Sequence, residues 1–341
     1  MTNPALRVFL GLAVVAAILF SAPLWLGRSD LRLLGEVMSY LALAVLWNLL
    51  AGYAGLLSVG QQAFVGLGGY ILFMAVIWLG LPPLAAIPLA FLGAGLVAML
   101  FAPLLFRLEG PYFAVGTWVA AETVALVFAA IPSLGGGAGV SLPVAAVRSI
   151  AETRAGAEIV IYSLLVALGI GTLAAAYALI RSKPGLALMA LRDNPLAAGA
   201  VGIDLWKVRF RTYVAVAAMT GAVGAVIFLQ KLRISPATAF SVNDWTAIVI
   251  FMVVIGGIGR LEGAIIGTLA YFVLRELLSD YGTFYLIVLG LAGIALMLVS
   301  RSGLWGMVER RFGWSLLPTR RNHPGGQGGD RPGHAAFSGR R

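Results

Sequence analysis

The sequence predicts an all-α, polytopic integral membrane bundle of about eight to ten transmembrane helices. Of the 341 residues, 60% are hydrophobic and only 11% are charged, whereas soluble domains are about half apolar and a quarter charged. The mean hydropathy is +0.96. The apolar residues also fall in successive runs of the roughly 20 residues that cross a bilayer. Because one soluble core could not bury so much apolar surface, we expect lipid to be the solvent.

The composition also excludes several kinds of site. There is no cysteine, which excludes disulfides and thiolate metal sites. The two histidines, His323 and His334, lie in a polar C-terminal stretch, which argues against a buried histidine centre. We therefore expect no metal, no cofactor and no catalytic residues. The net charge of +10 is concentrated beside apolar spans, a pattern typical of cytoplasmic segments rather than of nucleic-acid binding.

The first half of the chain contains five expected spans. The first is long for a signal-peptide core and lacks a clear small-x-small cleavage site, so we expect it to be retained. A glycine-rich stretch from Gly52 to Gln62 separates the second span from the third. The polar turn 107–111 separates the fourth from the fifth. The expected spans are 5–26, 33–51, a third that ends near residue 79, 84–106 and 112–131.

The second half is less regular. Residues 157–180, 212–229, 264–278 and 283–299 are expected spans, whereas 245–255 is too short to cross comfortably. Ten crossings from an inner N-terminus place both the loop 181–211 and the C-terminus inside, with most of the 24 basic residues. The short segments after residue 245 could instead be re-entrant. We expect a membrane domain over 1–303 and a basic, disordered tail over 304–341, rich in Gly, Arg and Pro.

The loop 181–211 is the only long basic interruption in the second half, and it contains a short capped helix, 194–202. Asn194 suits the N-cap, Pro195 the first helical position and Gly202 a left-handed C-terminal cap. Leu196, Ala197 and Ala198 follow Pro195, so the residues between the caps are small or apolar. A helix of barely two turns is not stable alone. We therefore expect it to dock on a protein partner; the alternative is that the basic loop rests on anionic lipid headgroups.

The stretch from Gly52 to Gln62 has two interpretations. Non-helical backbone at membrane depth is tolerated where it is buried in protein or lines a water-filled path. Ser58, Gln61 and Gln62 could hydrogen-bond a polar solute in such a path. Alternatively, the stretch is a cytoplasmic hairpin whose glycines allow close helix packing.

Glu122 lies near the middle of the span 112–131 and is expected to be the most secluded carboxylate. Ionisable groups within spans usually face a cavity or a partner. Glu122 could meet a solute ammonium or carry a proton, or it could be a protonated group that bonds a neighbouring helix. Thr117 lies on a nearby face. The stretch from Gly256 to Gly263 lacks the Gly-Lys-Ser/Thr ending of a phosphate loop, and no Walker motif occurs, so we expect a tight turn there.

Four stretches together resemble the LivM-type permease of bacterial ABC importers for branched-chain amino acids. They are NLLAGYAGLLSVGQ at 48–61, GPYFA at 110–114, the Ala197-Ala198-x3-Gly202 pattern and GGIG at 256–259. The resemblance covers about residues 33–303. Each stretch alone is weak, but the four in this order are specific.

The resemblance implies a permease in the bacterial inner membrane with cytoplasmic termini, which pairs with a LivH-type second permease, two cytoplasmic ABC ATPases and a periplasmic binding protein. It places ATPase coupling on Leu196, Ala197, Ala198 and Gly202, with Leu196 where the general pattern has Glu, and we assign Asn194 and Pro195, which cap the same helix, to the same coupling element. Such a permease is not itself an enzyme. The expected solutes are branched-chain amino acids or related small amino acids and amides.

Two rival functions remain at this point. The first is a proton-coupled secondary transporter that uses Glu122. The second is a membrane enzyme, but no metal-ligand cluster or nucleophile–base pair is visible in the sequence. For the transporter interpretations, the expected translocation-path residues are Ser58, Gln61, Gln62, Thr117 and Glu122.

Overall fold

The computed structural model describes residues 4–278, 287–288, 290–291, 293, 302–312 and 317. This part of the chain is a helical bundle, and eight of its helical segments are long and apolar enough to cross a membrane. The predicted all-α membrane fold is therefore confirmed. Most of the expected span 283–299 and nearly all of the tail beyond residue 312 lie outside the described residues.

The first five long helices match the expected spans to within a few residues, except that the second starts earlier. A π-helical turn, Leu49–Tyr53, extends this second helix to the start of the glycine-rich stretch. Prolines occupy the first turns of the fourth and fifth helices, where a missing N–H costs nothing. The helices are α1 (Pro4–Ser21), α2 (Arg28–Asn48), α3 (Gln61–Leu79), α4 (Pro83–Leu105) and α5 (Pro111–Ala129).

The second half contains both long and short helices. The long helices are α7 (Arg154–Arg181), α10 (Leu205–Lys231) and α13 (Leu261–Leu278). The short ones are α6 (Val144–Arg148), α8 (Lys183–Asp193), α9 (Pro195–Ala200), α11 (Pro236–Ala239), α12 (Ile248–Gly256) and α15 (Gly303–Phe312). Strands β1 (Val140–Ser141) and β2 (Arg233–Ile234) pair antiparallel, with Val140 opposite Ile234. Short 3-10 turns lie at Ala22–Leu24, Pro132–Leu134 and Gly136–Ala138.

Two expectations for this half need correction. The candidate span that contains residues 245–255 is longer than expected. It runs over Pro236–Gly256 and includes α11, a π-helical turn (Asn243–Ala247) and α12. A capping box between Ser235 and Thr238 lets this stretch start at Pro236, well before the start of the apolar run at residue 245. The start of the expected disordered tail is also helical: α15 packs on α12 and α13, and Trp305 is buried there.

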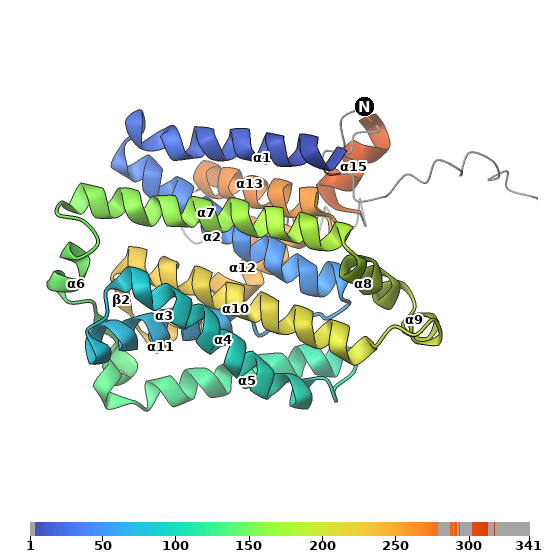
Figure 1. Ribbon diagram of the computed structural model, residues 1–341, viewed down its shortest axis with the longest axis horizontal. Coiled ribbons are helices and arrows are strands. Elements are labelled where there is room, and N and C mark those ends of the chain that lie inside the picture. The colour runs from blue at the N-terminus through green and yellow to red at the C-terminus, as the bar shows by residue number, and fades with distance from the viewer. Residues whose placement is uncertain are drawn as a thin grey trace, which may run out of the picture.

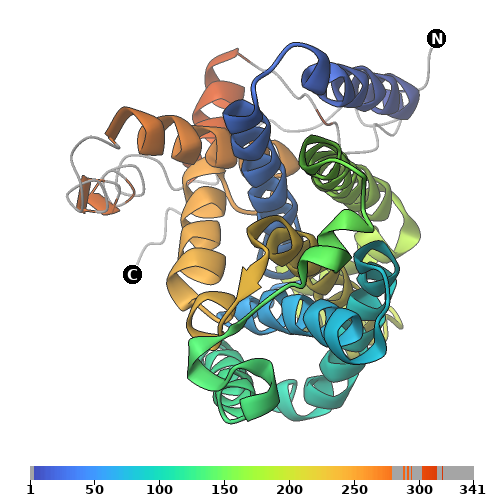
Figure 2. The same cartoon turned by 90° about the vertical axis from the view of Figure 1, so that its left-hand side faces the viewer.

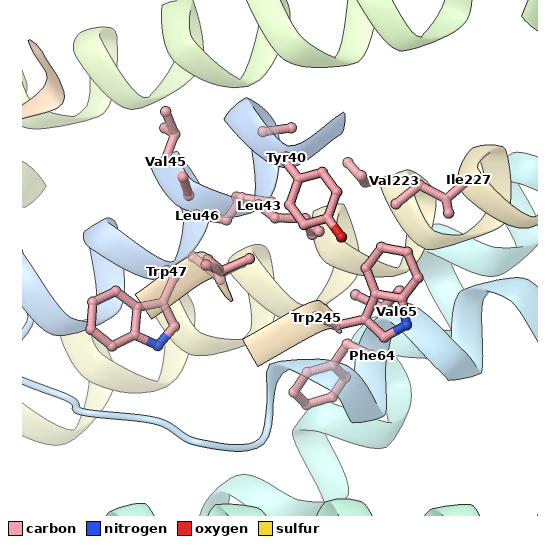
Figure 3. Close-up of a cluster of buried hydrophobic side chains, with 14 of the residues drawn as sticks. Tyr40, Leu43, Val45, Leu46, Trp47, Phe64, Val65, Val223, Ile227 and Trp245 are labelled. Carbon is pink, nitrogen blue, oxygen red and sulfur yellow. The ribbon is translucent and has the colours of Figure 1, made fainter. Parts of the chain in front are cut away.

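The centre of the bundle is formed by α2 and α10, which are the most buried of the long helices together with α3. Figure 3 shows Tyr40 of α2 beside Trp245, with Ile227 and Val223 of α10 nearby. The Tyr40 and Trp245 rings stack with centroids 5.8 Å apart. In contrast, α1, α4 and α5 lie at the periphery and expose many large apolar side chains. This distribution is typical of a bundle whose outer helices face lipid or another membrane subunit.

The two ends of the bundle differ. One end carries α8, α9, α15 and the start of α1, and the other carries α6 and the β1–β2 pair (Figure 1). We name them the α8–α9 end and the α6 end. The N-terminus and the loop 181–211 therefore lie at the same end, as six intervening crossings require.

Candidate functional site

The loop 181–211 folds into two helices, α8 and α9, at the tip of the bundle. The Asn194 side chain accepts a 3.0 Å hydrogen bond from the Ala197 N–H, and Gly202 has a φ of +84°. Both predicted caps of the short helix are thus confirmed. Helix α8 was not expected. It starts at Lys183, after the N-cap Ser182, whose hydroxyl accepts from the Gly185 N–H. Leu188 and Leu191 of α8 are buried.

The side chains of α9 point in two directions. Ala198 is only 2% exposed, so it packs against the chain itself and offers nothing to a partner. Leu196 is 87% exposed and Val201 78%. The outward surface of α9 is therefore formed by these two apolar side chains, with Pro195 and Ala197 beside them. Of the six predicted coupling residues, Ala198 is buried and the other five, including Leu196, are exposed.

A hydrogen-bonded junction connects α8 to the membrane helices. Arg192 donates from Nη1 to the carbonyl oxygen of Gly52, at 3.0 Å, and its Nε donates to Asp193. Gly52 has no room for a side chain, because a Cβ there would overlap the backbone of Gly259 and the side chain of Asn48. We call this contact the Arg192–Gly52 junction.

Asn48 joins a third element to this junction. Its amide nitrogen donates to the Arg260 carbonyl oxygen, and its amide oxygen accepts from the Gly259 N–H, both at 2.8 Å. Asn48 is fully buried, and a buried amide is stabilised only when it is hydrogen-bonded. The α12–α13 turn is therefore fixed to the same point of α2 as α8. The sequence did not single out Asn48 or Arg192 as site residues, although an amide within an apolar span was an available signal.

The α12–α13 turn itself matches the expectation for the stretch from Gly256 to Gly263. Gly257 and Gly259 have φ values of +122° and +78°, which favour glycine. A Cβ on Gly256 would collide with the backbone of Gly263. Glycine is thus required here for a tight turn and for close packing of α12 on α13.

The three polar residues Ser58, Gln61 and Gln62 are buried in protein. Gln61 donates to the Leu43 carbonyl oxygen at 3.1 Å, and the Thr246 hydroxyl donates to Gln62 Oε1 at 2.5 Å. Trp47 donates from its indole to the Ser58 carbonyl oxygen at 2.8 Å. The void beside Ser58 and Gln61 is about 10 Å³, which is room for one water at most. The polar groups are thus bonded within the protein, and the stretch begins at Gly52, which contacts α8 at the α8–α9 end. Both observations favour the hairpin interpretation.

Thr117 belongs to this cluster, whereas Glu122 does not. The Thr117 hydroxyl accepts from the Val59 N–H at 3.0 Å and connects α5 to the hairpin. Glu122 is exposed on the outer face of α5, where it accepts from the Trp118 indole at 3.1 Å.

The expectation that Glu122 is the most secluded carboxylate is therefore wrong. Thr117, Ala121, Val124 and Phe128 form the buried face of α5, and residue 122 falls outside that helical spacing. Among the carboxylates that the structure describes, Glu262 is the buried one, at 6% exposure, and it accepts from the Leu317 N–H. In the described part of the chain, no group of three or more His, Cys, Asp or Glu could hold a metal ion.

Comparisons with known proteins identify the family of the chain. Residues 31–300 match the family model described as "Branched-chain amino acid transport system / permease component". The chain is 24% identical, over 325 residues, to the high-affinity branched-chain amino acid transport system permease protein LivM of Escherichia coli (strain K12). That alignment covers 89% of this chain and 76% of the relative.

Two archaeal relatives match shorter regions. The probable branched-chain amino acid transport permease proteins LivM and LivH of Methanocaldococcus jannaschii are each 33% identical, over 103 and 105 residues. Each alignment covers 30% of this chain. The alignments cover 30% of the LivM relative and 31% of the LivH relative. No solved structure matches the chain. Since the family model spans most of the sequence, the chain belongs to the family of permease components of branched-chain amino acid transport systems.

Proposed function

We propose that this chain is a permease subunit of an ABC importer for branched-chain amino acids or related small amino acids and amides. In this proposal it lies in the bacterial inner membrane with the α8–α9 end in the cytoplasm, together with both termini. Its partners are a LivH-type second permease, two ABC ATPases and a periplasmic binding protein. Support comes from the family match and from the names of the LivM and LivH relatives.

The observation that carries the proposal is the outward apolar surface of α9. Leu196 and Val201 are almost fully exposed at the tip of a basic loop. Two such side chains stabilise a complex by about 1.5–3 kcal/mol each when a partner buries them. An ATPase groove that accepts α9 would move α8 with it, and the Arg192–Gly52 junction would pass that movement to α2 and to the α12–α13 turn.

The translocation path, in this proposal, follows the outer face of α5 at the contact with the second permease. Glu122 and Thr123 are exposed there, among apolar side chains. A carboxylate in the middle of a span is costly against lipid, so a protein surface or water must cover it. Ser58, Gln61, Gln62 and Thr117 then form the cytoplasmic boundary of the path, where their hydrogen bonds hold α5 against α3.

Reconstitution of the complete complex in proteoliposomes tests the proposal. We expect leucine uptake that requires ATP and is stopped by vanadate, and we expect no uptake when the ATPases carry an inactive nucleotide site. Leucine uptake driven by a proton gradient, with the ATPases inactive or absent, would support the secondary transporter instead. The exposed, Trp118-bonded position of Glu122 does not favour that alternative.

A further inference from the structure

A cavity of about 1070 Å³ lies at the α6 end of the bundle, opposite α8 and α9. Helices α2, α6, α7 and α10 contribute most of its walls, and Figure 2 views the bundle from this end. The walls carry more cations than carboxylates. The cations are Arg28, Arg32, Arg148, Arg154, Lys231 and Arg275, and the carboxylates are Glu36, Glu152 and Glu158.

Most of the cations around the cavity already have a carboxylate partner. Glu158 accepts from Arg32 at 2.5 Å and also lies within ion-pair distance of Arg28 and Arg154. Glu36 and Arg275 form a bidentate pair with bonds of 2.8 and 2.9 Å. The Glu36–Arg275 pair is electrically neutral, whereas Glu158 is shared by three arginines and leaves this part of the wall positively charged.

Lys231, the last residue of α10, has a different environment. Its ammonium lies 4.7 Å from the centre of the Trp245 ring and 5.7 Å from that of Phe228. Within the described parts of the chain it has no ion pair and no hydrogen-bond acceptor. Aromatic faces attract a cation without neutralising it. The ammonium therefore keeps three donors for an incoming anion.

The wall next to Lys231 contains aromatic and aliphatic side chains. The Tyr40 and Trp245 rings stack with an interplanar angle of 23°, and Ile227 and Leu232 continue the wall (Figure 3 shows Tyr40, Trp245 and Ile227). A ligand that fits must present an anionic group beside an apolar group. An α-amino acid with an aliphatic side chain has this chemistry.

We propose that the cavity at the α6 end is a binding site for a small amphipathic carboxylate of the amino-acid class. Lys231 binds the carboxylate, and the Tyr40–Trp245 pair contacts the aliphatic side chain. The site rests on the proposed import function, in which the α6 end faces the periplasm. In that function the cavity holds the solute before it moves to the path at the outer face of α5, a helix that contributes no residue to the cavity.

The lysines allow a direct test, because the sequence contains only Lys183, Lys207 and Lys231. Reductive ¹³C-methylation keeps their charge and gives three lysine signals, assigned with Lys→Arg variants. The full chain is placed in nanodiscs of zwitterionic lipid and titrated with leucine, and then with leucinamide, which lacks the carboxylate. We expect leucine to shift the Lys231 signal saturably, without moving the other two, and leucinamide to leave all three unchanged.

Two results would overturn the site. One is a Lys231 signal that does not respond to leucine. The other is a signal that responds only when an anionic phospholipid is added to the nanodisc, which would assign the cavity to a lipid phosphate.

Uptake by the complete importer gives a second readout. Loss of a charge-assisted hydrogen bond predicts that Lys231→Gln lowers leucine uptake about tenfold, while Lys231→Arg retains most of it. Arg107→Gln, an exposed cation at the other end, is the matched control and should behave as the unaltered chain. Equal uptake in Lys231→Gln and the control would contradict the site and leave the import function standing. An unaltered importer that takes up no amino acid would overturn the function, and the methyl signals would still decide the site.

Discussion

Arg192 and Gly52 lie 140 residues apart, yet the Arg192 guanidinium donates a 3.0 Å hydrogen bond to the Gly52 carbonyl oxygen. Through this bond the loop helix α8 contacts the end of α2 at the point where Asn48 also holds the α12–α13 turn. Direct hydrogen bonds therefore connect α8, the end of α2 and the α12–α13 turn. Such a junction can pass a displacement of the loop to two separate parts of the bundle.

The Arg192–Gly52 junction predicts that Arg192→Met uncouples the permease. Because α8 and α9 keep their caps and buried leucines, the variant should still insert and bind the ATPases. Leucine uptake per ATP hydrolysed should fall about tenfold, since a charged hydrogen bond is lost. Uptake and phosphate release in proteoliposomes measure this ratio. Arg211→Met removes an exposed cation from the start of α10 and serves as the control. If Arg192→Met leaves the ratio of leucine uptake to ATP hydrolysis unchanged, the Arg192–Gly52 junction does not take part in coupling.

The exposed apolar tip of α9 predicts that Leu196→Asp prevents ATPase docking. A buried carboxylate without a partner costs more than the lost apolar contact, so affinity for the ATPases should fall at least tenfold, roughly 1.4 kcal/mol or more. Co-purification and binding titrations measure it. Leu24→Asp places the same charge on a leucine that is 88% exposed at the α6 end, and its affinity should be unchanged. Ala198 is unsuitable for this test, because its buried position means that Ala198→Arg would disrupt α9 itself.

The outer face of α5 predicts contact with the second permease. The chain has no cysteine, so single cysteines can be introduced without background. Thr123→Cys, next to Glu122, should cross-link to cysteines on the second permease in membranes. Val14→Cys, on the peripheral helix α1 and 59% exposed, should not. If Thr123→Cys reacts only with lipid-soluble reagents and never with the second subunit, this face is lipid-exposed and the path lies elsewhere.

The proposed orientation makes a prediction for the three lysines. In intact cells with a permeabilised outer membrane, an amine reagent that cannot cross the inner membrane should modify Lys231 and spare Lys183 and Lys207. Inverted vesicles should give the opposite pattern, which mass spectrometry of tryptic peptides resolves. Modification of Lys183 from outside would show that the bundle has the opposite orientation, with α9 on the side of the membrane away from a cytoplasmic ATPase.

Much of this fold was predictable from local patterns. The spans follow from hydropathy, because a bilayer selects runs of sufficient length whatever their neighbours are. The caps at Asn194 and Gly202 follow from hydrogen bonds and dihedral angles within a few residues. The glycine turn between α12 and α13 was predictable for the same reason. The capping box at Ser235 carried an equally local signal, which the apolar run after it obscured.

The positions that decide function depended on tertiary packing. Helix α5 is apolar on nearly all faces, so its sequence did not reveal that Thr117 points inward and Glu122 outward. The burial of Ala198, the Arg192–Gly52 junction and the contact of Lys231 with the Trp245 ring arise from packing that local sequence patterns do not reveal. The sequence by itself determined most of the long spans and the caps of α9, because hydropathy and capping act over a few neighbouring residues. Only the tertiary structure decided which side chains meet, because in a uniformly apolar bundle that choice is made by the packing of one helix on another.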